Sequence, residues 1–329
     1  MKAPIDFALM CLLLVSGSPS SCNHAPARNV SLKEVSNLPG SPKVVADYQP
    51  WFGDPDHIDV GYSTQDPNIL RKQIEGARAM GIYAFAVDWY GPRRPFLERS
   101  TALLQHIASE QHFHVALMYD ETQDDNGHGT DDAMEAMELA YKKYIGPDAP
   151  GRDAYLMYQG RPVIFVFPKQ GHTDWNQVRQ QVNLWESPPI FLYQNDPPPQ
   201  YAKAFDGEYA WVYPGSKGWT KDGQAWGEDY LDNFYTKMRK RPDQITVGGI
   251  WPGFNDTKAS WSLNRHIDPR CGKTWDDTLS LFAENDEASH PIPFVLIATW
   301  NDYEEGTAIE RGLPHCGNAK PDAAPAGQQ

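Results

Sequence analysis

Eight short apolar or aromatic runs recur along the chain, and segments with helical spacing separate most of them. Several runs are continuous rather than alternating: residues 163–167 read Val-Ile-Phe-Val-Phe, and residues 294–298 read Phe-Val-Leu-Ile-Ala. Continuous apolar strands are typical of a parallel sheet that is covered on both faces. The pattern predicts strands at residues 44–51, 83–90, 114–120, 162–168, 190–195, 208–213, 245–251 and 293–300.

Helical patterns fill most of the gaps between these runs. The clearest begins at Asp66, a suitable N-cap that precedes Pro67 at the first helical position, and ends at Gly81. The connection at residues 197–204 is too short to assign to a helix with the same arguments. The other predicted helices cover residues 96–110, 131–144, 175–185, 230–240 and 274–284.

Strands that alternate with helices predict the α/β class and, with eight strands, a single-domain (β/α)8 TIM barrel. The alternative is an open, doubly wound sheet, which carries a Gly-rich phosphate-binding turn after its first strand. Residues 49–53 read Gln-Pro-Trp-Phe-Gly at that position, a turn that does not cradle a phosphate. The sequence therefore favours the barrel.

The two ends of the chain differ in composition from the middle. An apolar run at residues 7–15 follows Lys2 and precedes small residues, as in an export signal, and it is too short to span a bilayer. We expect a secreted or periplasmic protein, anchored as a lipoprotein if Cys22 is acylated. The predicted organisation is a signal peptide at 1–22, a linker at 23–43, a catalytic domain at 44–317 and a disordered tail at 318–329.

The charge and the aromatic content restrict the partners. The chain has 329 residues and a formal net charge of −14, which disfavours nucleic acid and anionic membranes. It has 11 Trp and 16 Tyr, which either line a sugar-binding cleft or fill the core. No segment after the signal is apolar enough for an integral membrane helix, and we expect a monomer whose partner is an oligo- or polysaccharide.

Two of the four cysteines lie outside the signal region, at Cys271 and Cys316. They flank residues 300–307, where candidate catalytic carboxylates occur. An exported protein can oxidise such a pair to a disulfide, and two free thiols are the alternative.

Polar and aromatic residues gather where the predicted strands end. The active site of a (β/α)8 barrel lies at the carboxyl ends of its strands, so these residues are candidates for substrate binding. Loops after strands are polar in many proteins, but the repetition around the barrel favours a site. The candidates are Tyr48, Trp51, Asp88, Trp89, Tyr119, Glu121, Trp251 and Asn301.

Asp302 and Glu305 follow the last predicted strand and are three residues apart. Cleavage of a glycosidic bond needs two carboxyl groups in different environments, one to donate a proton and one to act as nucleophile or base. If the chain turns after this strand, both side chains can enter one cleft, whereas in an unbroken strand they would face opposite sides. The alternative is an acidic helix N-terminus that faces solvent.

The motif Trp-Asn-Asp-Tyr-Glu-Glu-Gly-Thr-Ala-Ile-Glu at residues 300–310 resembles the signature of glycoside hydrolase families 99 and 71. Residues 48–53 (Tyr-Gln-Pro-Trp-Phe-Gly) resemble the opening motif of family 99, and residues 81–92 resemble its second-strand motif. Gly-Arg-Pro-Val at 160–163 also matches. The resemblance extends over about residues 44–312.

Family 99 enzymes are retaining endo-α-mannosidases on a (β/α)8 barrel. By this resemblance Glu305 is the acid/base, and Asp302 assists attack by the sugar 2-hydroxyl through a 1,2-anhydro intermediate. Family 99 has Glu at the position of Asp302, and Trp-His at the positions of Tyr303 and Glu304. Over residues 300–303, which read Trp-Asn-Asp-Tyr, the chain is more similar to family 71, the α-1,3-glucanases.

We therefore expect a glycoside hydrolase that cleaves α-mannan or α-glucan, with no cofactor. A non-catalytic carbohydrate-binding barrel and a glycan-acting transferase on the same fold are the alternatives. Residues 124–132 gather oxygen ligands as a calcium loop would, but their register does not fit an EF-hand. A solvated acidic loop explains them better, and we predict no metal site.

Overall fold

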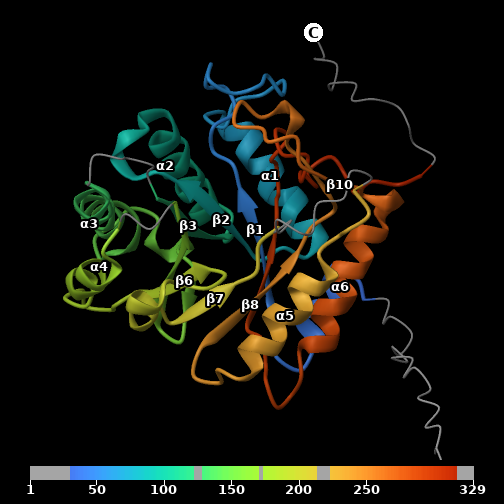
Figure 1. Ribbon diagram of the computed structural model, residues 1–329. Coiled ribbons are helices and arrows are strands. Elements are labelled where there is room, and N and C mark those ends of the chain that lie inside the picture. The colour runs from blue at the N-terminus through green and yellow to red at the C-terminus, as the bar shows by residue number, and fades with distance from the viewer. Residues whose placement is uncertain (1–29, 122–127, 170–172, 213–222, 317–329) are drawn as a thin grey trace, which may run out of the picture.

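The computed structural model describes residues 30–121, 128–169, 173–212 and 223–316, and its parallel strands close into a barrel (Figure 1). Neighbouring strands in the sequence pair with each other, and pairing of the first strand with the last completes the circle. The predicted (β/α)8 barrel is confirmed, with each strand inside or overlapping its predicted run. The strands are β1 (Lys43–Tyr48), β2 (Ala84–Trp89), β3 (His114–Asp120), β5 (Arg161–Phe167), β6 (Ile190–Gln194), β7 (Gly207–Tyr209), β8 (Ile245–Ile250) and β11 (Phe294–Ile297).

Helices on the outside of the barrel cover the strands (Figure 1). The first helix starts as predicted, because the Asp66 side chain accepts a hydrogen bond from the N–H of Asn68 (2.8 Å), and it ends at Gly81 in the left-handed conformation (φ 94°). A short 3-10 helix, Pro199–Ala204, connects β6 to β7. The α-helices are α1 (Pro67–Met80), α2 (Pro95–Glu110), α3 (Gly129–Ala140), α4 (Trp175–Val182), α5 (Glu228–Arg239) and α6 (Lys273–Asn285).

The connection between β8 and β11 carries an additional hairpin. Strand β9 (Phe254–Asn255) pairs antiparallel with β10 (His266–Ile267), and we call residues 256–265 between them the hairpin loop. The N–H of Asn255 donates a hydrogen bond to the carbonyl oxygen of Glu305 (2.7 Å). The hairpin is therefore joined directly to the segment that follows β11.

The packed domain starts earlier than the sequence predicted. A 3-10 helix, Leu32–Asn37, buries Leu32 and Val35 in the hydrophobic core, so residues 30–42 are not a free linker. Apolar spacing over six residues is too short to reveal such a helix, which is stable only because it packs on the barrel. The predicted signal peptide, Cys22 and the tail at 318–329 lie outside the described residues. None of the described helices is both long and apolar enough to cross a bilayer.

Cys271 and Cys316 form a disulfide, as predicted, with their Cα atoms 4.7 Å apart. Cys271 lies in the 3-10 helix Arg270–Gly272 that precedes α6, and Cys316 lies in the segment after β11. The disulfide therefore joins the start of α6 to the chain that leaves the candidate site.

Candidate active site

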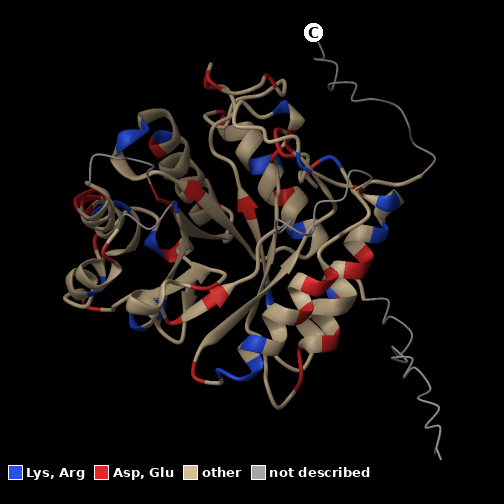
Figure 2. Cartoon of the chain, viewed as in Figure 1, with Lys and Arg blue, Asp and Glu red and all other residues tan. Residues whose placement is uncertain are grey.

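Acidic side chains converge at the carboxyl end of the barrel, and Figure 2 shows acidic residues at the arrowheads of β1 and β2. Asp47, Asp88 and Asp120 come from β1, β2 and β3, while Asp302 and Glu305 follow β11. The four aspartates are buried. Burial raises the pKa of Asp47, and negative charge on Asp88, Asp302 and Glu305 raises it further, so these carboxyl groups lie close enough to interact.

Burial is the main reason why these carboxyl groups hold their protons more tightly than usual. It raises the pKa of Asp47, of Asp88 and of Asp302, and repulsion from neighbouring carboxylates raises each of them further. Neighbouring carboxyl groups of this kind titrate together rather than independently. The arrangement is suited to moving protons.

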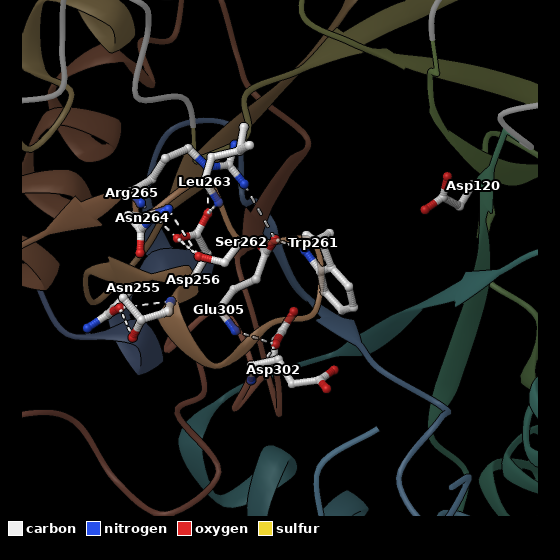
Figure 3. Close-up of polar contacts among 12 residues, drawn as sticks. Asp120, Asn255, Asp256, Trp261, Ser262, Leu263, Asn264, Arg265, Asp302 and Glu305 are labelled. Atoms are coloured by element: carbon white, nitrogen blue, oxygen red, sulfur yellow. Dashed lines mark hydrogen bonds and ion pairs between the residues drawn. The ribbon is translucent and has the colours of Figure 1, made fainter. Parts of the chain in front are cut away.

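Glu305 differs from the buried aspartates, because its side chain is 17% exposed. Figure 3 shows its carboxyl group beside Trp261, whose indole Nε1 donates a hydrogen bond to Glu305 Oε1 (3.0 Å). Arg265 lies 4.0 Å from the same oxygen. Burial raises the pKa of Glu305, whereas the indole hydrogen bond and Arg265 oppose that rise. A carboxyl group with a raised pKa that remains accessible has the properties of a general acid.

The chain turns immediately after β11, and this turn brings the two carboxyl groups of Asp302 and Glu305 together. Asp302 Oδ1 accepts hydrogen bonds from the N–H groups of Glu304 (2.9 Å) and Glu305 (2.8 Å). The N–H of Asp302 donates to Thr299 Oγ1 (2.8 Å). The turn fixes the orientation of the Asp302 carboxyl group beside Glu305, whose charge raises the Asp302 pKa.

Asn301 is buried and holds the ends of two strands together. Its Oδ1 accepts a hydrogen bond from the N–H of Gln49 (2.8 Å), and its Nδ2 donates to the Gln49 carbonyl oxygen (3.0 Å). The structure therefore places Asn301 next to the carboxylates as a link between the segments that follow β1 and β11.

The structure does not bring four of the predicted aromatic residues to the mouth of the barrel. The Tyr48 hydroxyl donates a hydrogen bond to Gln73 on α1 (2.7 Å), and the Trp251 indole donates to the Trp226 carbonyl oxygen (3.0 Å). The other two aromatic rings pack against residues outside the barrel: Trp89 contacts Tyr144, and Tyr119 contacts Trp175 on α4.

Strand alternation explains this placement. Asp47 precedes Tyr48, Asp88 precedes Trp89, and Asp120 follows Tyr119. Because successive side chains on a strand point to opposite faces, the aspartates face the interior and their aromatic neighbours face the helices. Asp47 and Asp120 were absent from the predicted site, although their position beside the chosen aromatics was a usable signal.

Glu121 and Glu304 each form hydrogen bonds with residues from another part of the chain. Glu121 accepts hydrogen bonds from the N–H groups of Lys169 (2.6 Å) and Thr173 (3.1 Å). The Lys169 ammonium group then lies 3.2 Å from Asp120 Oδ2 and supplies a positive charge to the acidic cluster. Glu304 is hydrogen-bonded to His57 Nδ1 (2.8 Å) and orders the segment after β1.

Trp51 lies in that segment and is buried. Its ring stacks on the ring of His57 with centroids 4.6 Å apart and an angle of 7°, and the Trp261 ring lies edge-on at 6.1 Å. Trp51 is therefore near Glu305 through Trp261. Sequence reasoning missed Trp261 because it belongs to the hairpin loop, which has no strand pattern.

Among the described residues, no group of three or more His, Cys, Asp or Glu side chains is suited to hold a metal ion. A cavity of about 160 Å³ lies at the opposite, amino-terminal end of the barrel. Its arginines have partners, Arg239 with Asn285 and Arg241 with Glu208. The carboxylate cluster is the better candidate, since barrels place their chemistry at the other end.

The sequence model of glycosyl hydrolase family 71 matches residues 60–320. A structure of the GH99 endo-alpha-mannosidase from Bacteroides thetaiotaomicron with bis-tris-propane is 18% identical, with a TM-score of 0.61 over 81% of this chain and 86% of that chain. A glycoside hydrolase-like protein is 15% identical, with a TM-score of 0.58 over 82% and 86% of the two chains. None of the curated proteins compared with the chain matches it.

At these identities the structural similarity shows a shared fold, whereas the family match covers most of the sequence. The match also confirms the resemblance to families 71 and 99 that residues 300–310 indicated. The chain belongs to glycosyl hydrolase family 71 and is a glycosidase.

Proposed function

We propose that this protein hydrolyses α-linked glycans with retention, using Glu305 as general acid/base and Asp302 as the assisting carboxylate. The α linkage is supported by the resemblance of residues 300–303 to α-1,3-glucanases. It is also supported by the similar barrel of an endo-alpha-mannosidase. An α-mannan is the first substrate to test, because O1 and O2 of an α-mannoside are trans and allow attack by the 2-hydroxyl. An α-glucan, in which O1 and O2 are cis, is the second.

One observation carries the assignment of roles. Glu305 combines a raised pKa with a partly exposed side chain, while Asp302 beside it is buried and held by two backbone N–H groups. Two carboxyl groups in such different environments can carry one proton between them and take opposite roles. Burial and the Glu305 charge raise the pKa of Asp302, and the backbone N–H groups oppose that rise by stabilising its ionised form. The proposed mechanism places the proton on Glu305 and the negative charge on Asp302.

In the first step Glu305 donates its proton to the glycosidic oxygen as the bond from that oxygen to C1 breaks. In an α-mannoside, where O2 lies opposite the leaving oxygen, the sugar 2-hydroxyl attacks C1, and its proton passes to Asp302. In the second step Glu305, now a carboxylate, takes a proton from water as the water opens the 1,2-anhydro ring, and Asp302 returns its proton to O2. Two inversions at C1 give net retention.

The test is hydrolysis of α-1,3-glucan and α-mannan, with the anomer of the first product followed by NMR. Glu305→Gln and Asp302→Asn are compared with Glu135→Gln, an exposed carboxylate on the outside of α3. We expect free reducing ends with the α configuration, lost in the first two variants and kept in the third. Turnover by Glu305→Gln at the wild-type rate contradicts the assignment, and elongated products instead of free reducing ends indicate a transferase.

A further inference from the structure

The hairpin loop is built around one buried carboxylate. Asp256 accepts hydrogen bonds from the N–H of Leu263 (3.0 Å), the N–H of Arg265 (2.7 Å) and the Arg265 guanidinium (2.7 Å), as Figure 3 shows. Burial alone would raise the pKa of Asp256, but these hydrogen bonds hold it below its usual value. The loop is therefore held rigidly by contacts that do not involve Trp261.

Trp261 lies in this loop, and its side chain is unusual in two ways. Its indole N–H donates to Glu305 Oε1, yet the residue is 41% exposed, one of few large apolar side chains so exposed in the described chain. Its ring also meets the stacked pair Trp51 and His57 at centroid distances of 6.1 and 6.2 Å. A large, flat, exposed ring fixed next to a catalytic group is what a sugar ring needs for stacking.

The same hydrogen bond makes the two carboxylate oxygens of Glu305 different from each other. Oε1 is engaged by Trp261, while within the described part of the chain no hydrogen-bond partner is found for Oε2. A general acid must place its free oxygen within hydrogen-bond reach of the leaving oxygen. The indole contact therefore sets which oxygen faces the glycosidic bond.

We propose that Trp261 forms the platform of the leaving-group subsite. Its exposed face stacks on the pyranose ring that departs from the cleaved bond, and its N–H orients Glu305 so that Oε2 meets the glycosidic oxygen. The proposal rests on the role of Glu305 as the acid. It identifies the ligand of this subsite as a neutral pyranose residue of the glycan.

The two roles of Trp261 are separable in measurements. Trp261→Phe keeps a stacking ring but removes the N–H, and Trp261→Ala removes both. Without the N–H the charged form of Glu305 loses a stabilising hydrogen bond, so its pKa rises and the basic limb of the kcat/KM profile moves to higher pH. Charged groups that act on Glu305 from the neighbouring elements are the same in all variants: Asp302, Arg265, Asp256, Lys169, Asp47 and Asp88.

The experiment measures kcat, KM and the pH profile on the glycan that the wild type cleaves and on the glycosyl fluoride of the same sugar, which has no departing ring. For the glycan we expect Trp261→Ala to raise KM about tenfold, from the loss of roughly 1.4 kcal/mol of stacking. Trp261→Phe should keep KM and shift the basic limb. The glycosyl fluoride should show no comparable rise in KM.

Trp185→Phe, which removes an indole that packs on Tyr141 far from the carboxylates, is the matched control and should behave as the wild type. An unchanged KM in Trp261→Ala, or an unchanged pH profile in Trp261→Phe, overturns the proposal. The failure of the proposed function looks different: Glu305→Gln would then remain active, whatever the Trp261 variants do.

Discussion

The side-chain amide of Asn301 forms a two-point pair with the backbone of Gln49, at 2.8 and 3.0 Å, between segments 252 residues apart in the sequence. The N–H of Trp300 adds a hydrogen bond to the Asp47 carbonyl oxygen (2.6 Å). The first and last strands of the barrel are therefore joined at the point where Asp302 and Glu305 begin to turn. Closure of the barrel and placement of the candidate catalytic pair depend on the same contacts.

Replacing Asn301 with Ala should cost both stability and activity. The substitution leaves the N–H and the carbonyl oxygen of Gln49 buried without partners, which costs about 3 kcal/mol of unfolding free energy. The turn at Asp302 loses its anchor, so kcat should fall as well. Chemical denaturation and steady-state kinetics measure the two effects. A variant that is as stable and as active as the wild type would show that the pair contributes nothing.

Glu305→Gln and Asp302→Asn should lose activity without losing the fold. Asn keeps an oxygen that can accept from the N–H groups of Glu304 and Glu305, so the turn after β11 persists. Removal of a positioned general acid or base lowers kcat by about 10²- to 10⁴-fold. Thermal unfolding of both variants should match that of Glu135→Gln, and a large loss of stability would show that the activity loss is not specific to the chemistry.

The order of the strands and helices was predictable from the sequence. Buried parallel strands form continuous apolar runs, and the residues that cap a helix lie within a few positions of its ends. The orientation of residues at the strand ends was not, since it depends on a single residue of register. Tyr48, Asp88 and Trp89 were all expected in the cleft. Only Asp88 faces the acidic cluster, together with Asp47, which was not predicted, whereas Tyr48 and Trp89 face the helices.

The contacts of the hairpin loop also could not be predicted from the sequence. Asp256 and Arg265 are nine residues apart, and Trp261 and Glu305 are 44 apart. No periodic pattern joins them, because the loop gains its shape from a buried carboxylate rather than from strand or helix spacing. By contrast the candidate carboxylates Glu305 and Asp302 could be proposed from the sequence, because one short motif carries both residues.

The disulfide should contribute stability but no chemistry. It closes a loop with a sequence separation of 45, for which the chain-entropy relation gives about 4 kcal/mol. Replacing both Cys271 and Cys316 with Ser should lower Tm and leave kcat unchanged below the new Tm. The wild type should respond to reductant by a similar fall in Tm, whereas the double variant should not. Equal Tm values for the two proteins would contradict this contribution.

The acidic cluster should make the protein less stable as the pH rises. Asp47 has a higher pKa in the folded state than in the unfolded chain, first because it is buried and second because Asp88 lies near it. The folded state therefore binds more protons than the unfolded state above the ordinary aspartate pKa, and the unfolding free energy falls as the pH rises through the folded value.

Asp47→Asn tests this sign directly, because an amide resembles the protonated acid and does not ionise. Denaturant titrations at pH 5 and pH 8 should show a smaller loss of unfolding free energy in the variant than in the wild type. The Gln49 side chain, which donates to Asp47 Oδ2 at 2.6 Å, can donate to the amide oxygen in the same way. Asp59→Asn, at an exposed carboxylate, should retain the wild-type dependence on pH. A variant at position 47 that loses as much stability as the wild type would show that Asp47 is already ionised at pH 5.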